Sequence, residues 1–301
     1  MAIARGARPR HDEGRGAPAA PALPAALPAA VPDGGSPFAV EMLRIGDQLL
    51  RVGRQPGPCP GTPLLLFNGI GGNIELLAPI ARWMPQREVI TFDIPGVGHS
   101  PLPRRPYRLS GIAGLAAGVL DHYGHARADV LGISWGGGPA QQFARSHAAR
   151  CRRLILCATS TGMLMVPNHP LVALKMAAPR RYMSKRYAMS VSGDIYGGDF
   201  RRQPERVAEF FKHVRWQSRM GYYLQIAAML GWTSVHWLHR VKQPALVMAG
   251  SDDPLVPLAN ARVLKFLLPH SELLVFDCGH LFLLTRAEAS ARAINEFLDR
   301  P

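Results

Sequence analysis

Short apolar runs alternate with segments of helical periodicity along most of the chain after residue 37. The runs are nearly continuous in Val, Ile and Leu, which is typical of strands that are covered on both faces. Two strands within residues 38–55 are joined by a hairpin turn at Gly46–Asp47. The pattern predicts an α/β protein with a mostly parallel central sheet and helices on both faces. Further strands are expected at residues 62–69, 87–95, 128–134, 152–160, 244–253 and 271–279, and helices at residues 74–84, 110–124, 137–151, 258–268 and 287–298.

This alternation is interrupted between residues 161 and 240, where the chain is rich in Met, Tyr, Trp and Arg. We expect a helical insertion that forms a lid over a core made of residues 38–160 and 241–301. Residues 220–239 contain no Asp, Glu, Lys or Arg, and twenty residues are enough to span a bilayer. Polar residues, two glycines and the position inside a domain argue against a transmembrane segment. A buried lid helix, or one that faces an apolar substrate, fits better.

Residues 1–37 are rich in Ala and Pro, and the prolines prevent a continuous helix, so this arm is expected to be disordered. Asp12 and Glu13 stand where a secretory signal needs positive charge, and the apolar stretch is broken by prolines. The expected compartment is therefore the cytoplasm.

Net charge is +14, and residues 180–242 alone hold twelve Lys or Arg against four acidic residues. This excess fits either an anionic partner surface or an ordinary solvated surface. The four cysteines form no C-x-x-C pair, and no zinc or other metal motif occurs. Nucleotide-binding motifs are also missing, so nucleotide binding is not expected. Nucleic-acid binding would rest on charge alone and is not expected either.

The sequence Gly132-Ile133-Ser134-Trp135-Gly136 fits the G-x-S-x-G pattern of a nucleophile elbow, in which a tight turn from strand to helix lifts a serine clear of the backbone. Such a turn brings the residues two before and two after the serine into close contact, so both must be small. The helix that follows directs its N-terminus at the site, where it helps to stabilise negative charge. Ser134 is therefore the candidate nucleophile.

A serine nucleophile needs a base, and the base needs an acid to orient it. Asp253 and His280 follow two late strands, in the chain order that this elbow requires. Asp252 is the alternative acid, and His99 is the alternative base near the site. Glycines that follow the strand at residues 62–69 allow the backbone to approach closely, so the N–H groups of Ile70 and Trp135 are the expected oxyanion hole.

Taken together, these residues resemble the α/β-hydrolase family and, more narrowly, the intracellular depolymerases of medium-chain-length polyhydroxyalkanoates. The resemblance covers the chain after about residue 37 and is most specific in the insertion. It rests on LLLFNGIGGNIELL, ITFDIPGVGHS, GISWGGGPAQQFA, APRRY, IYGGDFRRQPE, MGYYLQIAAMLGWTSVHWLH, AGSDDPLVPL and DCGHLFLLTRAEA. Two features depart from the family: the Ala/Pro arm, and Cys278 where the family looks more acidic.

The resemblance implies a cytoplasmic, granule-associated serine hydrolase without a cofactor, which cuts stored polyester to 3-hydroxy fatty acids or oligomers. Ser134, Asp253 and His280 would be nucleophile, acid and base. Two alternatives stay open: a general carboxylesterase or lipase, and a non-catalytic granule protein of the same fold. Positive charge on the lid would favour a granule coated by anionic lipid. Candidate aromatic residues for an apolar slot in the lid are Trp216, Tyr222, Tyr223, Trp232 and Trp237.

Overall fold

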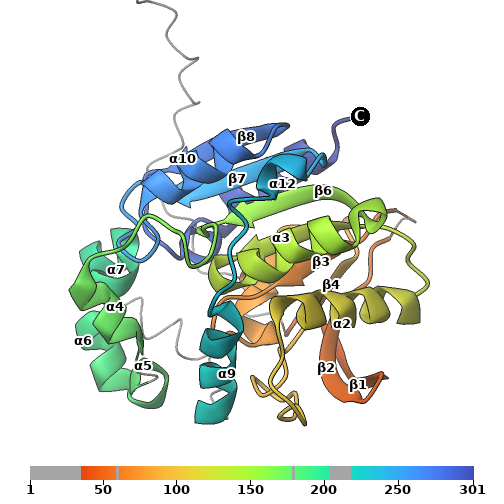
Figure 1. Ribbon diagram of the computed structural model, residues 1–301, viewed down its shortest axis with the longest axis horizontal. Coiled ribbons are helices and arrows are strands. Elements are labelled where there is room, and N and C mark those ends of the chain that lie inside the picture. The colour runs from red at the N-terminus through yellow and green to blue at the C-terminus, as the bar shows by residue number, and fades with distance from the viewer. Residues whose placement is uncertain (1–34, 59–60, 178–179, 204–217) are drawn as a thin grey trace, which may run out of the picture.

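The computed structural model describes residues 35–58, 61–177, 180–203 and 218–301. Its centre is an eight-stranded sheet with the order β1-β2-β4-β3-β5-β6-β7-β8 (Figure 1). The pairs β1–β2 and β2–β4 are antiparallel, and the other neighbours run parallel, so the prediction of a mostly parallel sheet is confirmed. The strands are β1 (Ala39–Ile45), β2 (Gln48–Gln55), β3 (Leu64–Phe67), β4 (Val89–Phe92), β5 (Ala128–Ile133), β6 (Cys151–Cys157), β7 (Ala245–Gly250) and β8 (Ser271–Phe276).

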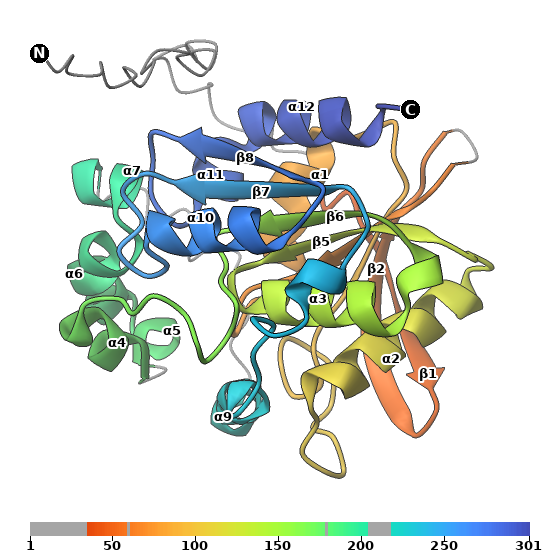
Figure 2. The same ribbon diagram turned by 45° about the horizontal axis from the view of Figure 1, so that its top comes forward.

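Helices cover both faces of this sheet, as the continuous apolar strands predicted (Figure 2). In the fully buried strand β3, Leu65 and Phe67 belong to one apolar cluster, and Leu64 and Leu66 belong to another. This alternation gives each face of the sheet its own core. The first cluster includes helices α2 (Leu109–His122), α3 (Gly137–Ser146) and α10 (Leu258–Leu267); the second includes α1 (Ala78–Arg82), α11 (Phe282–Thr285) and α12 (Ala287–Leu298).

Between β6 and β7 the chain forms the insertion, which lies beyond the carboxyl ends of the parallel strands (Figure 2). Its outgoing and returning segments pair at Gly162 and Thr233. In the open α/β sheets of other proteins, ligands bind at this end of the strands. The described helices of the insertion are α4 (Pro170–Ala177), α5 (Arg180–Met183), α6 (Lys185–Tyr196), α7 (Gly198–Arg202) and α9 (Arg219–Met229).

The uncharged segment 220–239 does not form one long helix. Helix α9 ends at Met229, and Gly231 adopts a positive φ of 73° that turns the chain. Within the part of the chain that the structure describes, no helix has the length and apolar character needed to cross a membrane. Residues 1–34 of the expected arm lie outside the described residues.

Candidate active site

Ser134 occupies the sharp turn between β5 and α3, and its φ of +54° is unusual for a residue with a side chain. The two flanking glycines make this turn possible. A Cβ on Gly132 would lie 2.3 Å from the carbonyl oxygen of Gly136, and one on Gly136 would lie 2.2 Å from that of Phe67. The tight contact that the sequence predicted is therefore present, and it holds a strained serine of the kind that clusters at active sites.

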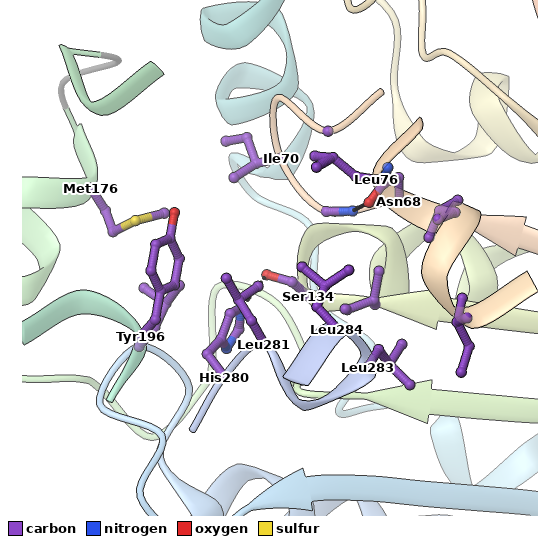
Figure 3. A pocket seen from close by; sticks show the side chains of 16 residues that line it. Asn68, Ile70, Leu76, Ser134, Met176, Tyr196, His280, Leu281, Leu283 and Leu284 are labelled. Carbon is purple, nitrogen blue, oxygen red and sulfur yellow. Dashed lines mark hydrogen bonds between the residues drawn. The ribbon is translucent and has the colours of Figure 1, made fainter. Parts of the chain in front are cut away.

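The side chains of Ser134, His280 and Asp253 form a continuous hydrogen-bonded chain. Ser134 Oγ lies 3.0 Å from Nε2 of His280, and Figure 3 shows these two side chains at the pocket. On the other side of the imidazole, Nδ1 of His280 lies 2.7 Å from Oδ2 of Asp253. The other oxygen of Asp253 accepts the backbone N–H groups of Leu255 and Val256, at 2.9 and 2.8 Å. An acid held in this way keeps the proton on Nδ1, so Nε2 is free to accept the proton of the serine hydroxyl.

The two alternative residues lie elsewhere. Asp252 is bound to the insertion, because it pairs with Arg201 at 2.7 Å and accepts the N–H of Gly198 at 2.8 Å. His99 is exposed, and its backbone N–H donates to Asp93. The geometry therefore favours Asp253 over Asp252 and His280 over His99.

The loop after β3 lies directly against the nucleophile. A Cβ on Gly69 would be 3.5 Å from Cβ of Ser134, and Ile70 and Ser134 line the same pocket. Asn68 holds the start of the loop, because its Oδ1 accepts the N–H of Gly69 at 2.8 Å. The backbone of this loop can thus approach an ester bound at Ser134. The assignment of the Ile70 and Trp135 N–H groups to the oxyanion hole stays a prediction.

A largely apolar pocket of about 600 Å³, part of it open to solvent, lies at the hydroxyl of Ser134. Figure 3 shows Met176 and Tyr196 of the insertion on one side of this hydroxyl, with Leu283 and Leu284 of α11 on the other. Such a pocket suits an alkyl group attached to a reacting ester. Its lining residues are Asn68, Gly69, Ile70, Gly72, Leu76, Leu77, Ile80, Ile133, Ser134, Met176, Tyr196, Leu255, His280, Leu281, Leu283 and Leu284.

The aromatic lining of this pocket differs from the one that the sequence predicted. Of the candidate residues, Trp216 lies outside the described residues, and Tyr222, Tyr223, Trp232 and Trp237 are not part of the pocket lining. The hydroxyl of Tyr222 donates to the carbonyl of Met176, and Tyr223 is exposed. The two tryptophans pack against each other and donate to Gln142 and Thr233. Packing within the insertion and against α3 therefore accounts for these contacts.

Tyr196 is a pocket residue that sequence reasoning missed. Its backbone oxygen accepts the N–H of His280 at 2.7 Å, and its ring stacks on the imidazole with centroids 6.3 Å apart. The following glycines allow this approach, because a Cβ on Gly198 would be 2.0 Å from the nitrogen of Gly279. The paired glycines Gly197 and Gly198 were the signal in the sequence that could have indicated a close contact here.

A charged network lies beneath the loop after β3. Arg51 is 2.5 Å from Glu75 and 3.1 Å from Asp93, and Asp93 accepts the backbone N–H of Ile74 at 2.8 Å. Burial alone would raise the pKa of Glu75, but hydrogen bonds from Arg51 and Asn73 outweigh it and lower this pKa to about 2. Burial raises the pKa of Asp93. The network therefore anchors the loop through Arg51 and the ionised carboxylate of Glu75, a contact that depends on pH.

Replacing Glu75 with glutamine should make the stability of the protein less sensitive to acid. The folded pKa of Glu75 is lower than the free value of 4.5, so the ionised group stabilises the folded state above pH 4.5, and this contribution is lost as pH falls toward 2. The unfolding free energy of the wild type should exceed that of Glu75→Gln by about 1–3 kcal/mol at neutral pH, and less in acid. Urea unfolding at about pH 7, 4 and 3 measures this. Glu288→Gln, at an exposed ion pair, is the control, and a difference that stays constant with pH would contradict the prediction.

The described cysteines are buried and carry no disulfide. Burial is the main cause that raises the pKa of Cys278 to about 12, so this thiol next to the His280 loop stays protonated. Among the described residues, no group of three or more His, Cys, Asp or Glu side chains is placed to hold a metal ion.

Comparison with known proteins places these features in context. Residues 62–287 match the family described as alpha/beta hydrolase fold. The chain is 48% identical over 265 residues to the poly(3-hydroxyalkanoate) depolymerase of Ectopseudomonas oleovorans, covering 88% of this chain and 94% of that protein. It is 28% identical to the 2-hydroxymuconate semialdehyde hydrolase of Pseudomonas sp. strain CF600, over 79% of this chain and 87% of that protein.

Solved structures share the same architecture. The enol-lactonase from Burkholderia xenovorans LB400 superposes with a TM-score of 0.75 at 23% identity, covering 86% of this chain and 100% of that chain. A thermophilic esterase from Thermogutta terrifontis gives a TM-score of 0.70, also at 23% identity, over 87% and 97% of the two chains. At this identity the likeness concerns the fold alone.

Proposed function

Because the chain belongs to the α/β-hydrolase fold family and, within it, to the poly(3-hydroxyalkanoate) depolymerases, and is thus an ester hydrolase, we propose that it cuts medium-chain-length polyester inside the cell through a serine acyl-enzyme. The observation that carries the proposal is the hydrogen-bonded chain from Ser134 through His280 to Asp253, at the mouth of an apolar pocket. The products would be 3-hydroxy fatty acids or short oligomers.

In this mechanism Nε2 of His280 takes the proton of Ser134 as Oγ attacks the ester carbonyl. The backbone N–H groups of Ile70 and Trp135 would hold the oxyanion of the tetrahedral intermediate, each donor contributing about 3–4 kcal/mol. The ester C–O bond then breaks, and His280 donates its proton to the departing hydroxyl end of the polymer. Water attacks the acyl-enzyme by the same steps and releases the acid, while Asp253 stabilises the imidazolium without taking its proton.

The pocket supports a substrate with long alkyl side chains. Leucine and isoleucine side chains from the loop after β3, from α1 and from α11 surround the space next to Ser134, and the described lining contains no Asp, Glu, Lys or Arg. Burial of each additional methylene of an alkyl chain is worth about 0.8 kcal/mol, so a long side chain gains more here than a methyl group. A general carboxylesterase or lipase would use the same three catalytic residues, so the substrate has to separate the two functions.

The outer surface of the insertion supports binding to a polyester granule. Leu171 and Leu174 of α4 are 59% and 70% exposed, one helical turn apart. Exposed apolar side chains continue over the neighbouring helices, with positive residues between them, and such a surface suits an apolar particle with an anionic coat. The exposed apolar residues of the described insertion are Met163, Leu164, Val166, Leu171, Leu174, Met183, Met189, Met220, Tyr223 and Leu230.

Rates of hydrolysis of three substrates test the proposed polyester substrate and the proposed granule binding. The wild type should hydrolyse long-side-chain polyester faster than short-side-chain polyester, and should also hydrolyse a soluble nitrophenyl ester. The double variant Leu171→Ser/Leu174→Ser should lose about 30-fold in activity on polymer particles, because the two exposed leucines contribute about 1 kcal/mol each to surface binding. Its rate on the soluble ester should not change.

Phe266→Ser is the matched control, because Phe266 is an 85% exposed apolar residue on α10, outside the insertion. Equal losses in the control and the double variant would contradict granule binding through the insertion. Activity of the wild type on the soluble ester and on short-side-chain material only would contradict the choice of substrate.

A further inference from the structure

Gln225 of helix α9 joins the insertion to both segments that flank the nucleophile. Its side-chain Oε1 accepts the N–H of Gly71 at 2.7 Å, and its backbone oxygen accepts the indole N–H of Trp135 at 2.8 Å. Gly71 directly follows Ile70, and Trp135 directly follows Ser134. Gln225, 90 positions from Trp135 and 154 from Gly71, therefore contacts the residue that follows one proposed oxyanion donor, Ile70, and the side chain of the other, Trp135.

The loop that carries Ile70 needs such an anchor. It contains Gly69, Gly71 and Gly72, and Gly71 has a φ of +68°, a conformation that glycine adopts without strain. The amide of Asn68 closes the base of the loop, because its Oδ1 accepts the N–H of Gly69 and its Nδ2 donates to the carbonyl of Asn73 at 2.7 Å. Gly71 lies between these two points. Since glycines leave a loop many alternative conformations, the bond from Gly71 to Gln225 selects among them.

Helix α9 is itself held rigidly against the core. Gly221 lies one turn before Gln225 on the same face, and a Cβ there would be 1.8 Å from the carbonyl oxygen of Gly96. One turn after Gln225, Met229 packs near Gly138 of α3, whose Cβ would lie 3.3 Å from the methionine sulfur. Backbone contact before Gln225 and side-chain packing after it prevent the helix from sliding, so its hydrogen bonds keep a constant position.

The burial of Gln225 also argues for a role beyond packing. The residue is fully buried, and no partner for its Nε2 lies within the described residues. A buried amide with one unpaired nitrogen costs about 1–3 kcal/mol, which an apolar side chain of the same size would avoid. Local features that lower stability in this way are expected where function requires them.

We propose that Gln225 is a positioning residue that sets the oxyanion hole, so that helix α9 of the insertion is part of the catalytic apparatus and not only a cover. The proposal rests on the proposed serine mechanism. Stabilisation of an oxyanion depends on donors placed within a few tenths of an ångström. Release of Gly71 would let the Ile70 N–H move away from the oxyanion, whereas the ester in its ground state would bind as before.

The variant Gln225→Met tests this inference, because methionine has a similar shape but cannot accept the N–H of Gly71. On a soluble nitrophenyl ester we expect kcat to fall about 10- to 100-fold, with KM changed by less than about threefold. A trifluoromethyl ketone, which forms a tetrahedral oxyanion with the serine, should bind more weakly by the same factor as kcat falls. The pH midpoint of kcat, which reports the histidine, should not move.

Gln142→Met is the matched control. Oε1 of Gln142 accepts the indole N–H of Trp232 at 2.9 Å, so this change also removes one hydrogen bond between insertion and core, but between two residues that do not line the pocket. Its kcat should stay near that of the wild type. If Gln225→Met does not fold, Gln225→Asn, which keeps the amide but is one methylene shorter, replaces it.

The inference is wrong if kcat of the folded Gln225 variant stays within about threefold of the Gln142 control, or if KM and ketone binding weaken together while kcat is unchanged. Those outcomes would assign Gln225 to stability or to general substrate binding. Failure of the serine mechanism itself would look different, since the ketone would then not inhibit the wild type.

Discussion

Ser134→Ala should lower kcat by a factor of about 10⁵ to 10⁶ on polyester and on soluble esters, the largest effect that we expect from a single change. The hydroxyl of Ser134 is the atom that would form the acyl-enzyme, and it lies 3.0 Å from Nε2 of His280. Without it, the base has no nucleophile to activate. Initial rates on both substrates measure the loss, and a fluorophosphonate probe should label the wild type but not the variant.

The exposed Ser190 of α6 provides the control, because Ser190→Ala removes a serine hydroxyl of the insertion without contact with the site. It should keep wild-type activity. Circular dichroism and the unfolding midpoint would establish that Ser134→Ala is folded, since alanine can adopt the same backbone conformation. Activity of this variant above about one per cent of the wild type would mean that another group is the nucleophile.

Asp253→Asn should lower kcat by a factor of about 10⁴, the second-largest effect. The amide keeps the shape of the carboxylate and can still bind the backbone N–H groups of Leu255 and Val256. Its nitrogen, however, cannot accept the proton of Nδ1, so His280 would take the tautomer whose Nε2 carries a proton and cannot act as a base. The rate measured from about pH 6 to 9 should be low throughout, without recovery at high pH.

Asp252→Asn is the paired control for this prediction. Asp252 is the neighbouring residue and pairs with Arg201 at the exposed edge of the insertion, so its loss should change kcat by less than about fivefold. If the two variants lose similar activity, the acid is not specifically Asp253. If only Asp252→Asn is inactive, the assignment of the acid is reversed.

Local sequence patterns predicted much of this molecule because their physical causes act over short distances. Buried strands read as continuous apolar runs, since both faces of each strand are covered. Gly132 and Gly136 marked the elbow, because a side chain at either position would collide with backbone 2.2–2.3 Å away. The positions of Asp253 and His280 at the ends of late strands then followed from the parallel sheet, in which all such ends meet at one edge.

Contacts between the insertion and the core were not predictable in the same way. The sequence indicated aromatic residues for the substrate slot, yet Trp232 and Trp237 bind their own segment and α3, whereas Tyr196 and Met176 reach the pocket. Each of these side chains is large and mostly apolar, as residues that line a substrate pocket commonly are. Which of them faces the ester depends on how helices separated by many residues dock on the sheet.

The sequence by itself determined the parallel sheet, the strained serine turn and the chain order of the three reactive side chains, since periodicity and glycine sterics act between near neighbours. Only the tertiary structure decided that Asp253 rather than Asp252 faces the imidazole, that Tyr196 lies against it, and that Gln225 holds the glycine loop. These contacts join residues that are 27 to 154 positions apart in the chain. Over such separations, no local sequence pattern indicates which partner a side chain contacts.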